Sequence, residues 1–203
     1  MANRRDTNRQ LLALAGAFAL ALGGPPIAAQ HSVPQAHHPA GAETKTASSD
    51  FIRTVRAATE RFKDVAVAEA EGYALMFGCV SGPDWGAMGL HYVNLALVGD
   101  GQLDPAKPEI VIYEPLPNGR VRLVGADFLV FAADWHRTSQ ATPELGGQLL
   151  HLFESPNRFG LPDFYTLHVW AWKDNPAGTF SNWHSKVSCD AFGGKEPLAS
   201  TAR

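Results

Sequence analysis

The sequence predicts an α+β domain, in which an antiparallel sheet of about five to six strands packs against one N-terminal helix or curls into a partial barrel. Three observations lead to this fold class. Apolar residues recur at three- and four-residue steps over residues 50–71, as in an amphipathic helix. Several later segments alternate from residue to residue like strands. Short turns, among them Pro117-Asn118-Gly119, join consecutive segments, and short connections favour antiparallel neighbours.

The first 30 residues are predicted to be a secretory signal peptide. Arg4, Arg5 and Arg9 precede an apolar run over residues 11–23, which is too short to span a bilayer comfortably. Small residues follow the run, as they do at a cleavage site. We therefore expect an exported protein, periplasmic or extracellular, with no stable membrane span after cleavage. The Arg4-Arg5 pair leaves both the Sec and the twin-arginine route open.

The rest of the chain divides into a linker and one domain. Residues 31–49 are polar and show no apolar periodicity, which predicts a disordered linker. Residues 50–203 have a length that fits a single globular domain. Its helix is expected to begin with Asp50 as the N-cap and to stop at Gly72.

The expected strands follow the helix in order. Glycines crowd residues 78–89, which indicates tight turns or a close backbone approach before the first strand. The last strand is largely apolar on both faces, as suits a strand that is covered on both sides, and His168 lies on the face of Trp170 and Trp172. The five strands are expected over residues 90–98, 109–115, 120–132, 148–154 and 164–172.

Charge and cysteine content narrow the possible partners. The net charge of the whole chain is −3 and no basic block is present after the first 30 residues, so nucleic acid binding is not expected. The two cysteines, Cys79 and Cys189, are predicted to form a disulfide in an oxidising compartment. The alternative is a pair of thiolate metal ligands, which an exported protein disfavours because its thiols tend to oxidise first.

Four polar side chains interrupt otherwise apolar strand faces, and buried polar groups need partners. If these faces converge, the side chains would share one site, and imidazoles with a carboxylate form an ordinary ligand set for zinc, copper or non-haem iron. Each also has a simpler explanation: Glu114, for example, can pair with Arg120 or Arg122 across a hairpin. Trp170 and Trp172 would line the pocket beside a ligand. The candidate metal ligands are His91, Glu114, His151 and His168.

Three functions remain open on this evidence. The preferred hypothesis is an exported binding protein that holds zinc, copper or a small molecule in a His- and Trp-lined pocket. The second is a metal-assisted enzyme, or one that uses His and Glu as acid and base. The third is a structural or interaction module without a ligand. No Gly-x-Ser-x-Gly elbow and no phosphate-binding loop occurs in the sequence, so a nucleophile cannot be named.

Four blocks of the sequence resemble a family of short exported bacterial proteins known only as hypothetical proteins. The blocks are residues 86–94, 103–115, 157–162 and 167–189. The resemblance extends from residue 59 to residue 189 and implies export and a single domain. It implies no activity.

Overall fold

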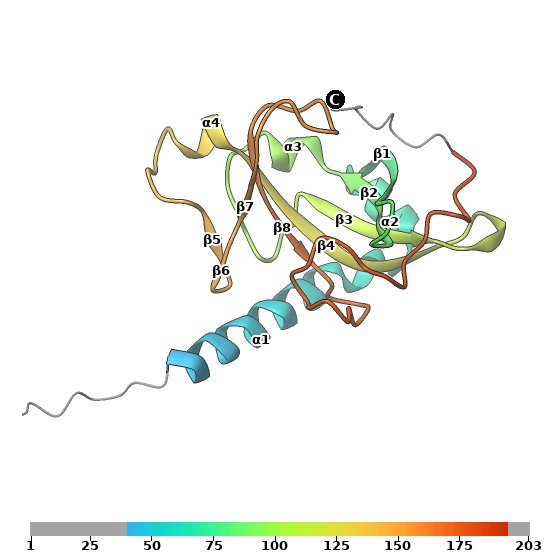
Figure 1. Ribbon diagram of the computed structural model, residues 1–203, viewed down its shortest axis with the longest axis horizontal. Coiled ribbons are helices and arrows are strands. Elements are labelled where there is room, and N and C mark those ends of the chain that lie inside the picture. Colours follow the sequence, from blue (N-terminus) through green and yellow to red (C-terminus); the bar gives the residue numbers. More distant parts are fainter. Residues whose placement is uncertain (1–39, 195–203) are drawn as a thin grey trace, which may run out of the picture. The chain divides into compact units, whose positions relative to one another are not determined.

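The computed structural model describes residues 40–194, with side chains from Ser48 onward. Its centre is a six-stranded antiparallel sheet that curls into a half-barrel, in the order β1-β2-β3-β4-β8-β7 (Figure 1). A separate two-stranded sheet pairs β5 (Glu144–Leu145) with β6 (Gln148–Leu149). The predicted α+β class with an N-terminal helix is confirmed. The strands of the large sheet are β1 (Ala74–Ser81), β2 (Ala87–Val93), β3 (Ile110–Pro115), β4 (Val121–Phe131), β7 (His151–Phe153) and β8 (Phe164–Val169).

The N-terminal helical segment is longer and more broken than expected. Helix α1 spans Ala40–Thr59, so it begins ten residues before Asp50, and residues 40–49 of the expected linker are helical. A 3-10 turn, η1 (Glu60–Lys63), and a short helix, α2 (Val65–Ala70), follow. The break has a local cause, because the Asp64 carboxylate accepts a hydrogen bond from the backbone N–H of Ala66 and starts α2 as its N-cap.

This helical segment covers one face of the sheet, here called the outer face (Figure 1). Phe51 and Val55 of α1 pack against Phe128 and other buried residues of β4 and β8. In η1, Phe62 packs against Tyr73 and Tyr113, and the Tyr113 hydroxyl donates to the Phe62 carbonyl at 2.7 Å. Burial of these apolar side chains, more than helix propensity, holds the helical segment on the sheet.

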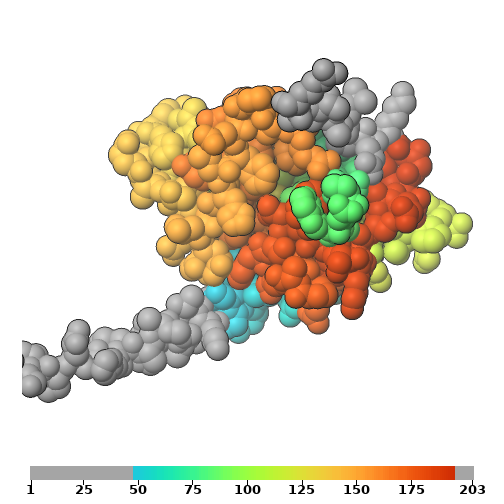
Figure 2. All heavy atoms as spheres, viewed as in Figure 1, coloured from blue at the N-terminus to red at the C-terminus, as the bar shows by residue number. Residues whose placement is uncertain are grey.

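The opposite, inner face is covered by loops and by the chain after β8. Figure 2, viewed as in Figure 1, shows yellow, orange and red segments over most of the visible surface, with a green patch from the β1–β2 region among them. Beneath this cover, Trp170 and Val187 pack with Ile112 on the sheet. The inner face is therefore a second core, closed by irregular segments in place of a helix.

The predicted disulfide between Cys79 and Cys189 is confirmed, with Cα atoms 5.7 Å apart. It joins β1 to the segment that covers the inner face, across a sequence separation of 110 residues. The bond therefore anchors the C-terminal cover, which has no regular secondary structure of its own.

Three predicted strands differ from those observed. The first was expected over residues 90–98, but β2 ends at Val93, because the Asn94 side chain accepts from two backbone N–H groups and starts α3 (Leu95–Val98). The strand expected over residues 148–154 is split, since the Leu150 N–H turns away to the Pro143 carbonyl. The last strand stops at Val169, three residues early, and Trp170 bonds instead to the Thr179 carbonyl.

The expected signal peptide lies outside the described residues. Within the described part of the chain, no helix combines the length and apolar character needed to cross a membrane.

Candidate metal centre

Three buried side chains of the inner face lie together: His91 from β2, Asp127 from β4 and His168 from β8. One ligand atom from each lies within 4.8 Å of the others. Strand register explains the grouping. On the β4–β8 pair, Asp127 stands directly opposite His168. On β3, the residue opposite Asp127 is Ile110, and the residue opposite His91 is Ile112, two positions along the same strand. Paired residues of neighbouring strands share a face, so all three side chains point to the same side of the sheet.

His168 is fully buried, and neither of its ring nitrogens has a hydrogen-bond partner. Its ring lies 4.6 Å from that of Trp170 and 6.4 Å from that of His91, measured between centroids. Burial, followed by the neighbouring His91 and His184, lowers the pKa of His168 to about 3, so the ring is neutral at neutral pH. A neutral imidazole without partners offers a free lone pair inside the protein.

His91 is oriented by its own strand. Its Nδ1 lies 3.1 Å from the carbonyl oxygen of Gly89, and in the neutral ring this nitrogen donates, which leaves Nε2 as the free acceptor. Gly89 has a φ of +109°, and a Cβ there would meet the Tyr113 carbonyl oxygen at 2.6 Å. A side chain at position 89 would therefore displace the carbonyl that orients His91. Burial lowers the pKa of His91 to about 4.

Asp127 supplies the only carboxylate of the group. The Thr166 hydroxyl donates to its Oδ1 at 2.5 Å. Burial raises the pKa of Asp127 to about 7, although this bond and backbone N–H groups favour the charged form. Burial of a carboxylate charge beside two neutral imidazoles is energetically costly, and a bound cation would offset that cost.

The three side chains match a recognised ligand set. Two imidazoles and one carboxylate occur in zinc and non-haem iron sites, and imidazole also suits copper. Ligand atoms around a tetrahedral ion with bonds of 2.0–2.2 Å are about 3.3–3.6 Å apart. Any pair of these atoms at the 4.8 Å limit must therefore close by about 1.2–1.5 Å, which side-chain rotation of a few tens of degrees provides.

A small cavity adjoins the cluster on the inner face. Its volume is about 20 Å³, measured as the space open to the centre of a water-sized sphere. His91, Asp127 and Thr166 are its polar lining. Among its apolar walls, Phe77 adopts a φ of +66°, which is rare for a residue other than glycine, within a bulge of β1 that places its ring against Phe159. The apolar walls include Phe77, Met88, Phe153, Phe159, Leu161 and Phe164.

The structure brings together only two of the four predicted metal ligands, His91 and His168. Glu114 lies apart, with its carboxylate 2.9 Å from Lys173 Nζ and 2.5 Å from Arg122, so the hairpin pairing weighed for it is the one observed. His151 is exposed on β7, the edge strand. Neither residue contributes to the cluster.

The two predicted pocket tryptophans separate as well. Trp170 contacts His168 on the inner face. Trp172 lies with the helical segment, where its Nε1 donates to the Thr59 hydroxyl and Lys63 lies over its ring. Regular alternation would put both rings on one face, but the strand ends at Val169 and the chain turns between them.

Asp127 is the site residue that sequence reasoning missed. The signal was present, because Asp127 is a lone acid between Gly125 and Leu129 on one expected strand face. Nothing in the alternation says which residue stands opposite it. His184, in contrast, is buried with both ring nitrogens bonded, to the Asp174 carbonyl and the Lys186 N–H, and so is satisfied without a ligand.

Comparisons with protein-family models, curated proteins and solved structures find no match for this chain.

Proposed function

We propose that this domain binds one transition-metal ion, zinc, copper or ferrous iron, through His91, Asp127 and His168. The observation that carries the proposal is the pair of unpartnered nitrogens on the fully buried His168. Among the described residues, these are the only buried side-chain nitrogen or oxygen atoms without a hydrogen-bond partner. An unsatisfied buried polar group costs about 1–3 kcal/mol, so its retention points to a ligand.

The rest of the cluster supports a metal ion over an anion or an organic cation. Both imidazoles are neutral, with their pKa values lowered to about 3 and about 4, and neutral imidazole is the form that binds metals. The carbonyl of Gly89 sets the His91 tautomer, and the Thr166 hydroxyl holds Asp127. Such outer contacts are typical of metal ligands.

Calorimetric titration of metal-free protein with zinc, copper and ferrous iron tests the proposal. We expect one ion per chain to bind, and His168→Ala to weaken binding by at least a hundredfold. His151→Ala is the matched control, because this histidine is exposed and outside the cluster. Every variant retains the histidines of residues 31–49, so binding there would be equal in all. Equal affinities for the wild type and His168→Ala would remove the proposal.

A metal-assisted enzyme is the second candidate, and the cavity favours it. Catalytic zinc and iron sites keep three protein ligands and leave a position for water or substrate. Here two of the three ligands, His91 and Asp127, line the cavity, so space for a further small ligand lies beside them. Glu114 has no part in this chemistry, because its carboxylate is engaged by Lys173 and Arg122. Azide or another small anion that displaces a metal-bound water would shift the absorption spectrum of a cobalt-substituted protein, whereas a closed four-ligand site would give no shift.

We also place the protein outside the cytoplasm. The N-terminal sequence supports this, and the buried disulfide is compatible with an oxidising compartment. Fractionation of native cells with mass spectrometry of the intact chain provides the test. We expect a mature N-terminus near residue 30 and no free thiol. A full-length, reduced chain in the cytosol would overturn this assignment.

A further inference from the structure

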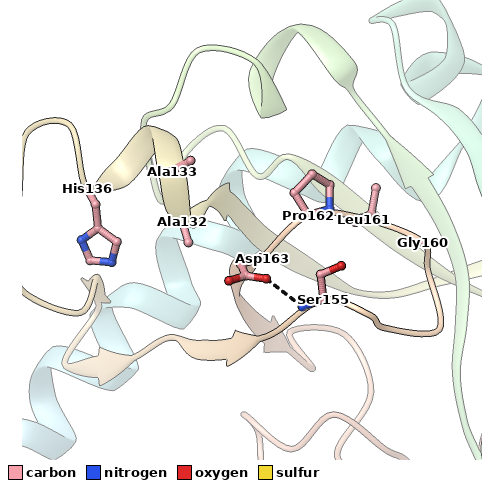
Figure 3. Close-up of a pocket in the computed structure, with 8 residues that line it drawn as sticks. All are labelled: Ala132, Ala133, His136, Ser155, Gly160, Leu161, Pro162 and Asp163. Carbon is pink, nitrogen blue, oxygen red and sulfur yellow. Dashed lines mark hydrogen bonds between the residues drawn. The ribbon is translucent and has the colours of Figure 1, made fainter. Parts of the chain in front are cut away.

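A surface pocket and the cavity beside the candidate metal centre share one lining residue, Leu161. The surface pocket is open and has a volume of about 780 Å³. It lies between α4 (Ala132–Trp135) and the loop of residues 155–163, as Figure 3 shows. The cavity lies on the sheet side of the same loop and is lined by Phe159 and Leu161 from it. Leu161 is therefore the side chain at which the surface pocket and the cavity adjoin.

The size of the cavity restricts what it can hold. Space of about 20 Å³ for the centre of a water-sized sphere corresponds, for a compact shape, to a void about 6 Å across. This admits a molecule of two or three heavy atoms and excludes most organic substrates. The cavity is also smaller and less open than the surface pocket.

The lining of the cavity restricts the polarity of its ligand. Four phenylalanines make up much of the wall, and the polar side chains are His91, Asp127 and Thr166. Asp127 and Thr166 already bond each other, and His91 bonds the Gly89 carbonyl. Backbone N–H groups of Phe128 and Leu167 also bond Asp127, so His91 Nε2 is the free acceptor that remains. A water molecule needs two to four partners, whereas cavities with mostly apolar walls take up uncharged gases.

The loop that carries Leu161 is held in place by its own side chains. Asn157 donates through Nδ2 to the Leu161 carbonyl at 2.9 Å, and its Oδ1 accepts from the Phe159 N–H at 3.1 Å. Asp163 accepts from the Ser155 N–H at 2.7 Å, the bond drawn in Figure 3. These bonds tie the loop backbone at both ends, so rotation of the Leu161 side chain is the movement by which we expect the cavity to open to the surface pocket.

We propose that the cavity binds a small uncharged molecule of the size of dioxygen, which enters from the surface pocket past Leu161. It binds beside His91 and Asp127, in contact with any ion that these residues hold. Only this last contact rests on the proposed metal site. The cavity and its entrance belong to the protein chain alone.

Methyl NMR of the metal-free protein under dioxygen and under argon tests the inference. Dioxygen is paramagnetic, so its presence in the cavity should enhance relaxation of the Met88, Leu129 and Ile110 methyl groups several-fold over buried methyls of the outer face, such as Val55. Uniform enhancement over all buried methyls would overturn the inference.

Two variants test the entrance. Leu161→Ala should increase the enhancement at the cavity methyls or the exchange rate of xenon with the cavity, and Leu161→Trp should decrease it, each several-fold. Leu152→Ala is the matched control, because this leucine is exposed and outside the cavity lining. Unchanged exchange in both Leu161 variants would exclude this entrance. The NMR experiment uses no metal, so it is independent of the metal titration. Gas binding without metal affinity would overturn only the proposed metal site. Metal affinity without gas binding would overturn only this inference.

Discussion

Replacing His168 with leucine should change protein stability in opposite directions with and without metal. In metal-free protein the imidazole is fully buried and its nitrogens have no partner. Leucine has nearly the same volume and no polar atom, so the substitution removes the desolvation cost of the ring. In metal-loaded protein the same substitution removes a ligand.

The expected magnitudes follow from these contacts. Removal of the unsatisfied ring should stabilise the folded protein by about 1–3 kcal/mol. Loss of the ring contact with Trp170 should destabilise it by about 0.5–1.5 kcal/mol. The metal-free variant should therefore be about 1 kcal/mol more stable than the wild type. An ion at a thousand times its dissociation constant stabilises the wild type by about 4 kcal/mol. With metal, the wild type should therefore be about 3 kcal/mol more stable than the variant.

Urea unfolding followed by circular dichroism, at pH 7.5 with chelator or with zinc, measures both differences. At that pH an unfolded histidine is neutral, and so is folded His168 with its pKa of about 3, so protonation adds little. His184→Leu is the control, because its ring bonds the Asp174 carbonyl and the Lys186 N–H. It should lower stability by about 1–3 kcal/mol in both conditions. A metal-free His168→Leu protein less stable than the wild type would refute the reasoning.

Three further predictions concern protons and the disulfide. The imidazoles are already neutral and the pKa of Asp127 is about 7, so metal binding at pH 6 should release one proton. Metal affinity should therefore rise about tenfold per pH unit up to pH 7. Calorimetry in two buffers counts the released protons, and a release of two would contradict these pKa values. Burial raises the pKa of Glu109 to about 8, so folded protein keeps a proton that unfolded protein loses near pH 4.5, and stability falls as pH rises between these values. Glu109→Gln should abolish that fall, gaining on the order of 4 kcal/mol over the wild type between pH 5 and pH 8 in urea titrations, and parallel curves would contradict it. Replacing Cys79 and Cys189 together by serine should lower the unfolding free energy by about 4–5 kcal/mol in the chain-entropy account, and an unchanged urea midpoint would show that the covering segment holds without it.

Local sequence patterns predicted elements better than their ends. Alternation located β3, β4 and β8 to within a few residues, because neighbours along a strand must face opposite sides. Elements ended where a single side chain competed for the backbone, as Asn94 does at α3 and Asp64 does at α2. The strand predicted over residues 90–98 extended past Asn94 because the residues that follow, Leu95–Val98, are apolar, and a short apolar run fits a strand or a helix equally well.

Site prediction failed where it needed strand register. Asp127 joins the histidines because it stands opposite His168, and that pairing depends on how β4 and β8 align. Its position relative to β3 depends on the register of a second pair, β3 and β4, which contains a bulge near Tyr113. Glu114 is removed from the site by Lys173, 59 residues away in sequence. Contacts at such a separation have no local signature.

The sequence alone therefore determined the fold class, the disulfide and the placement of His91 and His168 on apolar strand faces. Two cysteines allow only one pairing, and periodicity of two or 3.6 residues distinguishes strand from helix. Tertiary structure alone decided that Asp127 completes the cluster, that Trp172 lies with the helical segment, and that Leu161 lines both the cavity and the surface pocket. Periodicity sets the face on which a side chain lies, whereas its neighbours on that face depend on register, bulges and loop packing across the whole chain.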